Sequence, residues 1–219
     1  MSSLVLMKIL ESSAARYDAG MRVLTLGRIG RAHTAIADLA APETGRRVLE
    51  IGCGTGLLTE QLVARGAIVE ALDQNPEMLD LARARLRAAP QGRVTLHERT
   101  AAEIDGLPAK SFDTVAASLV FSEMSSSERA YVLRHVVRVL RPGGQLIVAD
   151  EVRPRRSWQR LVHSLVRGPL VLLTWIVTGS TTRAIADLRG EVERVGLCVR
   201  EERRGGLDTF AVLCAEKPA

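Results

Sequence analysis

The chain has 219 residues, of which 47% are hydrophobic, and this suits a single α/β domain with a substantial core. Its net charge of +5 at pH 7 comes almost wholly from arginine and permits, without requiring, a nucleic-acid or anionic-membrane partner. Aromatic residues make up only 3% of the chain, which leaves few rings for stacking on bases, so no nucleic-acid partner is expected.

The cysteines Cys53, Cys198 and Cys214 are far apart and show no CxxC or Cys/His spacing. Neither a disulfide framework nor a zinc site is therefore expected. Near the N-terminus, the apolar residues 4–7 are interrupted by Lys8, and no basic segment of the signal-peptide kind precedes them. We expect a cytoplasmic setting.

Residues 1–45 read as two helical stretches, at 14–28 and 31–39, which end at the Pro-Glu-Thr-Gly sequence of 42–45. Because they precede the first predicted strand, these helices are placed to cap a site at the end of that strand.

The most informative stretch is residues 48–59, where an apolar run reaches Glu50, alternates glycine at positions 52, 54 and 56, and then becomes helical. Glycine lets the backbone leave a buried strand in a tight turn and approach a ligand closely. The helix that follows directs its first amides and its positive dipole end toward the same place. A dinucleotide-binding turn would have glycine or alanine where this chain has Leu57, which disfavours a nicotinamide-dependent oxidoreductase.

The second predicted strand, residues 68–72, ends at Asp73. An acid about twenty residues beyond a glycine turn is typical of a carboxylate that accepts hydrogen bonds from ribose hydroxyls. Asp73 also stands just before a helix that starts at Pro76, so capping of that helix is the alternative. The glycine turn and the acid occur together, which favours ribose binding.

The remaining pattern continues to alternate helix and strand. Ser125 and Glu128 form a capping box for a helix that runs to 140. A Gly205-Gly206 turn joins the last two strands, the second of which is expected to insert antiparallel. The other predicted elements are a helix at 76–88, strands at 94–97, 112–118 and 145–149, a turn at 141–144, a helix at 187–195, and strands at 197–203 and 208–215.

Four signals in this order resemble the class I S-adenosylmethionine-dependent methyltransferases: the GxGxG turn behind Glu50, then Asp73, then Phe112-Asp113, then Leu-Arg-Pro-Gly-Gly-x-Leu at 140–146. The resemblance implies an α/β fold with a Rossmann-like sheet of seven strands, mostly parallel with the last strand antiparallel. It also implies one methyltransferase domain, 1–219, built from a helical cap (1–45), a cofactor-binding core (46–152), a lid insert (153–180) and a C-terminal helix and strand pair (181–219).

In this family the glycine turn holds the methionine end of S-adenosylmethionine, and a Tyr-Asp pair such as Tyr17-Asp18 often reaches the cofactor or the substrate. Tyr17 packed under the cap is the alternative. Family members commonly have aspartate where this chain has Thr100, although the Thr100 hydroxyl and the Ala101 amide could still contact adenine. The candidate cofactor-binding residues are Tyr17, Glu50, Gly52, Cys53, Gly54, Gly56, Asp73, Gln74, Thr100, Ala101 and Ser118.

Residues 153–178 form an insert longer than a crossover needs. Its first part places arginines beside an apolar helical face, and residues 169–177 are almost wholly apolar. Arg167-Gly168-Pro169 interrupts the run, so a membrane-spanning helix, which needs about twenty apolar residues, is not expected. Three interpretations stay open: a buried lid, a pocket wall for a lipophilic acceptor as in the menaquinone and ubiquinone C-methyltransferases, and a helix lying on an anionic membrane. A secondary resemblance is to the corrinoid-protein-associated methyltransferases.

Methyl transfer from a sulfonium needs alignment and exclusion of water, and a general base where the acceptor carries a proton. Glu123, Glu151 and His163 are the candidate bases, each with a structural alternative: a helix start, an arginine partner, or a solvated lid position. No metal site is expected, because no further acid accompanies Asp150-Glu151.

We predict methyl transfer to a small, lipophilic acceptor. The alternative is a catalytically silent cofactor-binding module that docks on a membrane or a partner protein through residues 153–178.

Overall fold

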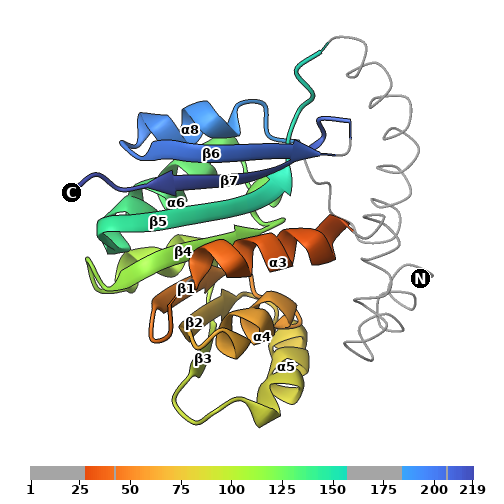
Figure 1. Cartoon of the computed structure of the whole chain (residues 1–219), viewed down its shortest axis with the longest axis vertical. Coiled ribbons are helices and arrows are strands. Elements are labelled where there is room, and N and C mark those ends of the chain that lie inside the picture. The colour runs from red at the N-terminus through yellow and green to blue at the C-terminus, as the bar shows by residue number, and fades with distance from the viewer. Residues whose placement is uncertain (1–27, 42, 157–183, 206) are drawn as a thin grey trace.

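The computed structural model describes residues 28–41, 43–156, 184–205 and 207–219. These residues contain a seven-stranded sheet in the order β3-β2-β1-β4-β5-β7-β6 (Figure 1). Strands β1 to β5 pair in parallel, and β7 is antiparallel to both of its neighbours, β5 and β6. The predicted mostly parallel sheet is confirmed. The strands are β1 (Arg47–Ile51), β2 (Ile68–Asp73), β3 (Val94–Glu98), β4 (Phe112–Ser118), β5 (Leu140–Glu151), β6 (Cys198–Gly205) and β7 (Phe210–Glu216).

Helices cover both faces of the sheet (Figure 1). One face carries α3 (Arg28–Ala40), α4 (Leu57–Ala64) and α5 (Pro76–Arg85), and the other carries α6 (Ser126–Val139) and α8 (Leu188–Arg194). Neighbouring strand residues divide between the two cores: Val48 packs with α3 and α4, whereas Leu49 packs with α6. This follows from the alternation of side chains along a strand, and it explains why β1 is apolar on both faces.

Local signals set where the helices begin. The Asn75 side chain accepts hydrogen bonds from the amides of Glu77 and Met78 at 2.9 and 3.4 Å, so Asn75 rather than Asp73 caps α5. The predicted capping box of α6 is confirmed: Ser125 N donates to Glu128 at 2.7 Å, and Glu128 N donates back to Ser125 Oγ at 3.3 Å. The Asp73 carboxylate is therefore not needed as the N-cap of α5.

The predicted turn at 141–144 was wrong. These residues belong to β5, which begins at Leu140, and a register shift between Phe112 and Thr114 accommodates them as a bulge. The cause is a distant pairing: Gly143 N donates to Lys217 O at 2.9 Å, and Lys217 N donates to Gly144 O at 2.8 Å. Pairing with residues near the C-terminus therefore extends β5 through a Pro-Gly-Gly sequence that by itself predicts a turn.

The other boundaries move less. The helix predicted to reach residue 88 ends at Arg85 and continues as a 3₁₀ helix, Leu86–Ala88. Most of the predicted helical cap and of the lid insert, residues 1–27 and 157–183, lies outside the described residues. Among the helices that are described, none has the length and apolar character needed to cross a bilayer.

A buried ion pair ties α6 to α8. Arg129, only 7% exposed, donates from Nε and Nη2 to the two Glu191 carboxylate oxygens at 2.7 and 2.8 Å. Its Nη1 donates to Met124 O at 2.7 Å, in the turn that leads into α6. One guanidinium therefore joins two helices and the chain segment that follows β4.

Replacing Arg129 with leucine should lower the free energy of unfolding by about 1–3 kcal/mol, because the half-buried Glu191 carboxylate and Met124 O would lose their donor. Urea unfolding followed by circular dichroism measures this. Arg134→Leu, at an exposed position on the same helix, is the control and should stay within about 0.5 kcal/mol of wild type. Equal effects of the two substitutions would contradict the role given to the ion pair.

Candidate active site at the carboxyl edge of the sheet

The strand order reverses between β1 and β4, since β2 and β3 lie to one side of β1 and β4 and β5 to the other. In open α/β sheets, ligands bind outside the carboxyl ends of the strands at such a switch point. The predicted residues Gly52, Asp73, Ala101 and Ser118 follow or end β1 to β4 there.

The glycine turn is held by its own amides. Gly52 N and Cys53 N both donate to Leu72 O, at 2.8 and 2.9 Å, and Gly56 N donates to Cys53 O at 2.9 Å. Gly54 N donates to Asp73 Oδ2 at 2.7 Å. The turn after β1 is thus fixed against the end of β2, and it offers a ligand a backbone surface beside a carboxylate.

Two glycines of this turn serve different purposes. A Cβ at Gly52 (φ +73°) would lie 2.2 Å from Val120 Cγ2, so a side chain there collides with the segment after β4. A Cβ at Gly54 (φ +53°) would meet nothing within 4 Å. Gly52 therefore allows the protein to pack, whereas Gly54 faces open space next to Asp73.

Asp73 is half-buried, and both of its oxygens are oriented by backbone amides: Oδ2 by Gly54 and Oδ1 by Asn75, the latter at 2.9 Å. Each carboxylate oxygen can accept a further hydrogen bond. Such a fixed carboxylate fits two neighbouring hydroxyls of a ribose. Gln74, the next residue, is exposed.

At the end of β3, Thr100 begins a 3₁₀ helix, Ala101–Gly106. Its amide and hydroxyl both donate to Glu103 Oε2, at 2.7 and 3.0 Å. The Thr100 hydroxyl proton is therefore already engaged, so Thr100 could meet an adenine only as an acceptor. Ala101, which follows it, is half-buried at the same edge.

Glu50 is 2% exposed and accepts a hydrogen bond from Thr59 Oγ1 at 2.6 Å. Burial raises the pKa of the Glu50 carboxyl to about 8, and the nearby Asp73 carboxylate adds to the shift. Cys53 is 6% exposed and packs in the core with α3 and α4, and burial raises the pKa of its thiol. Its side chain therefore lies in the core, and contact of Cys53 with the cofactor stays a prediction.

On the other side of the switch point, Asp150 organises the chain after β4. This fully buried carboxylate accepts from Phe121 N at 2.8 Å, Ser122 N at 3.2 Å and Glu151 N at 2.7 Å. Burial raises the pKa of Asp150 to about 6, although these hydrogen bonds oppose the shift. Leu119 adopts a left-handed conformation (φ 58°), which is strained for a side chain of its size.

Two of the predicted bases lie at this edge. Glu123 ends the 3₁₀ helix Phe121–Glu123 and is exposed, yet desolvation by the surrounding protein, with smaller contributions from Asp150 and Asp73, raises its pKa. Glu151 is the last residue of β5. Tyr17 and His163 lie outside the described residues. In the part of the chain that is described, no group of three or more His, Cys, Asp or Glu side chains could hold a metal ion.

The sequence interpretation missed three features of the site. Asp150 has a local signal, because like Asp73 it stands near the carboxyl end of an apolar strand. His33 of α3 is 7% exposed, and its Nε2 lies 3.1 Å from Ser118 Oγ. The spacing of Ala32, Ile36 and Ala40 identifies the buried face of α3 and could have placed His33 near it. The backbone strain at Leu119 has no such signal.

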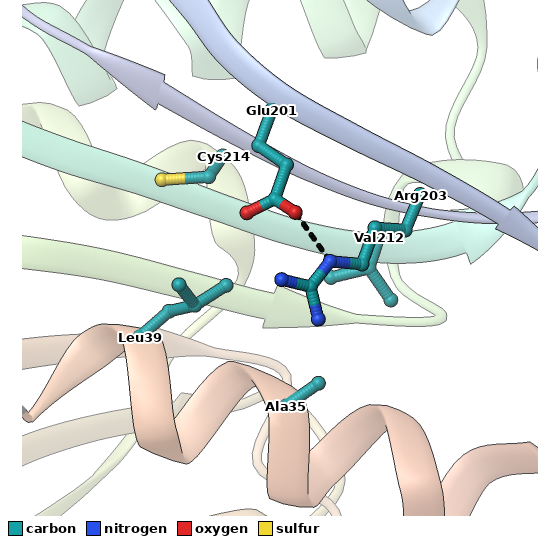
Figure 2. Close-up of a pocket in the computed structure, with 6 residues that line it drawn as sticks. All are labelled: Ala35, Leu39, Glu201, Arg203, Val212 and Cys214. Carbon is teal, nitrogen blue, oxygen red and sulfur yellow. Dashed lines mark hydrogen bonds and ion pairs between the residues drawn. The ribbon is translucent and has the colours of Figure 1, made fainter.

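A small pocket lies elsewhere, between α3 and the β6–β7 edge (Figure 2). Its volume of about 10 Å³ has room for roughly one water molecule. Figure 2 shows the Glu201–Arg203 ion pair on the β6 side of this pocket, facing Ala35 and Leu39 of α3. A groove of about 440 Å³ between α6 and α8 lies on the opposite helical layer. The small pocket cannot hold an adenosyl ligand, and neither feature borders the glycine turn.

Comparison with known proteins agrees with this geometry. A family model described as a methyltransferase domain matches residues 48–144. An uncharacterized methyltransferase of Mycobacterium bovis is 42% identical over 130 residues, which cover 59% of this chain and 50% of that protein. A ubiquinone/menaquinone biosynthesis C-methyltransferase of Hahella chejuensis is 33% identical over 210 residues, covering 88% of this chain and 83% of that protein. Among solved structures, a methyltransferase of Mesorhizobium loti superposes with a TM-score of 0.65 at 22% identity, covering 85% of this chain and 98% of that one.

The fold and the switch-point site are those of a class I methyltransferase. The chain belongs to the S-adenosylmethionine-dependent methyltransferases. It spans about half the length of the mycobacterial relatives that it matches. The residues present fit the cofactor of this family, because the open space at Gly54 adjoins a carboxylate whose two oxygens are already oriented.

The two glycines should separate folding from cofactor binding. Gly52→Ala should destabilise the protein by about 2–5 kcal/mol, because a collision with Val120 adds to left-handed strain. Gly54→Ala should cost only about 1–2 kcal/mol but weaken S-adenosylhomocysteine binding at least tenfold, because its methyl group enters the ligand space. Urea unfolding and isothermal titration calorimetry measure the two effects. A stable Gly54→Ala variant with unchanged affinity would contradict this placement of the ligand.

Glu50 should make stability fall as pH rises. Its folded pKa of about 8 is above its ordinary value, so its contribution is fully present below about pH 4.5 and is lost as pH rises through 8. The loss approaches about 1.4 kcal/mol per pH unit within that window. Glu50→Gln should therefore gain stability relative to wild type between pH 5.5 and 8, measured by urea unfolding. Glu60→Gln, at an exposed site, is the control; a Glu50→Gln difference that stays constant with pH would refute the assignment.

Proposed function

We propose that the protein transfers a methyl group from S-adenosylmethionine to a small, lipophilic acceptor by direct in-line displacement. The observation that carries this proposal is the 2.7 Å hydrogen bond from Gly54 N to Asp73 Oδ2, beside open space at the topological switch point. This arrangement supports the proposal, because a glycine turn beside a carboxylate at a switch point suits an adenosyl cofactor.

Each part of the edge has a place in this proposal. Asp73 accepts from the ribose hydroxyls, and Ala101, with Thr100 as an acceptor, lies at the adenine end. Glu50 and Ser118 belong to the methionine end, together with the glycine turn. Because Glu50 is buried with a raised pKa, the cationic ammonium and sulfonium groups of the ligand would favour its ionised form.

The bound cofactor supplies a methyl group activated by its sulfonium. The residues of this chain supply position: correct alignment of the reacting atoms accounts for roughly 7–11 kcal/mol of such barriers. Asp150 contributes by holding Phe121 and Ser122 in a fixed turn, so that the segment after β4 forms a defined wall.

Where the acceptor carries a proton, Glu123 is the favoured general base. Its pKa is raised toward the working pH, which suits a base, and the Asp73 and Asp150 carboxylates act on it electrostatically. Glu151 lies at the end of the neighbouring strand, so it is the second candidate.

Two observations support a lipophilic acceptor: the composition of residues 153–177 and the description of a related protein. Residues 169–177 are almost wholly apolar, and residues 153–167 combine arginines with apolar side chains. The Hahella relative is described as a ubiquinone/menaquinone biosynthesis C-methyltransferase. A lipophilic acceptor also gives the basic insert a second use, namely contact with the anionic membrane in which such a molecule dissolves.

Mass spectrometry of lipid and small-molecule extracts, incubated with enzyme and deuteromethyl-labelled S-adenosylmethionine, tests the proposal. A labelled apolar product should form with wild type and with Asp80→Asn, an exposed control on α5. It should fall at least tenfold with Asp73→Asn. Cofactor binding without any labelled product would instead favour a silent binding module, and flotation on anionic liposomes with and without residues 153–178 would test its docking.

A further inference from the structure

Helix α3 carries a buried histidine to the candidate active site. The helix lies along β4 with two hydrogen bonds between them. Thr114 Oγ1 donates to Ala40 O at 3.2 Å. Seven residues before Ala40, His33 Nε2 lies 3.1 Å from Ser118 Oγ. The two contacts set the register of the helix against the strand. Packing of α3 along β4 therefore brings His33 and Ser118 within reach of each other.

Ser118 lies between the two halves of the site. Ile51 pairs with Ala117 across β1 and β4, which places Ser118 beside Gly52, the first residue of the glycine turn. On its other side Ser118 pairs with Ala149, next to Asp150. The strained Leu119 follows directly and leads the chain away from the sheet.

A histidine on this face of α3 is chemically unusual. The neighbouring buried positions are apolar, namely Ala32, Ile36, Ala37 and Ala40, and they already form the contact with the sheet. Burying an imidazole among them costs free energy that an apolar side chain would not. The contact with Ser118 is what the imidazole adds.

We propose that His33 is a positioning residue, which fixes the Ser118 hydroxyl as an acceptor for the α-ammonium group of the bound cofactor. This inference rests on the proposed function, since it assumes that the methionine end lies beside the glycine turn. When His33 Nε2 accepts the hydroxyl proton, Ser118 Oγ has no other proton to donate. A serine whose rotation is fixed in this way favours a cationic donor over a carboxylate.

The surroundings match a cationic ligand group. At this edge the Asp73 carboxylate acts electrostatically on both Glu50 and Glu123, and Asp150 acts on Glu123. A positive group placed among them relieves their mutual repulsion. The His33–Ser118 pair adds a directed acceptor to that general attraction.

Isothermal titration compares two ligands that differ at the methionine end: S-adenosylhomocysteine, which has the α-ammonium, and 5′-methylthioadenosine, which lacks it. His33→Phe and Ser118→Ala should each weaken S-adenosylhomocysteine binding about 2- to 12-fold, the range for one lost hydrogen bond. Neither should change 5′-methylthioadenosine binding by more than about twofold. The double variant should bind no more weakly than Ser118→Ala alone.

His33→Gln should restore affinity to within about twofold of wild type, because its amide oxygen can accept the same proton. Thr34→Ala, at an exposed position of α3, is the matched control for changes in the helix. Equal weakening of both ligands, additive effects in the double variant, or failure of His33→Gln in a protein with wild-type thermal stability would overturn the inference. Wild type that binds neither ligand would instead refute the cofactor site itself.

Discussion

The site depends on one hydrogen bond, from Gly54 N to Asp73 Oδ2. This bond joins the turn after β1 to the end of β2, and with the Asn75 amide on the other oxygen it orients the Asp73 carboxylate. The same turn needs Gly52, because Val120 from the segment after β4 fills the space where a Cβ would lie. Three strand ends are therefore locked together before any ligand arrives, which is the preorganisation that positional catalysis requires.

The features that could be predicted from the sequence are those set by local chemistry. Glycine can be recognised as the residue that left-handed turns favour, and the capping box of α6 is a pattern of four residues. The position of Asp73 at the end of a strand can also be predicted from the apolar run that precedes it. The turn expected at 141–144 failed because Lys217, far away in sequence, pairs with Gly143 and Gly144. His33 is a mixed case: the apolar spacing of α3 indicates that it lies near the buried face, but its contact with Ser118, 85 residues away, cannot be predicted from a local pattern.

Electrostatics connects the stability of the protein to its ligand. Glu50 is buried and accepts a hydrogen bond from Thr59, and its raised pKa means that the ionised form is disfavoured in the absence of a cation. An apolar residue at position 50 would avoid the free-energy cost of burying a carboxyl group. Positions where a buried residue breaks the rules of packing are commonly functional ones, and under the proposed function a positively charged ligand would stabilise the ionised Glu50 carboxyl.

The two sides of the switch point divide the work of the site. The β1–β2 side, with its glycine turn and Asp73, is built from contacts between two consecutive strands and, under the proposed function, suits the adenosyl part of a cofactor. The β4–β5 side depends on long-range contacts instead: His33 from α3, and Asp150 across to Phe121 and Ser122. Under the proposed function, changes in α3 can therefore alter the methionine end of the cofactor site without touching the Gly54–Asp73 bond. The segment after β4 is not independent in this way, because Val120 packs against Gly52 of the glycine turn.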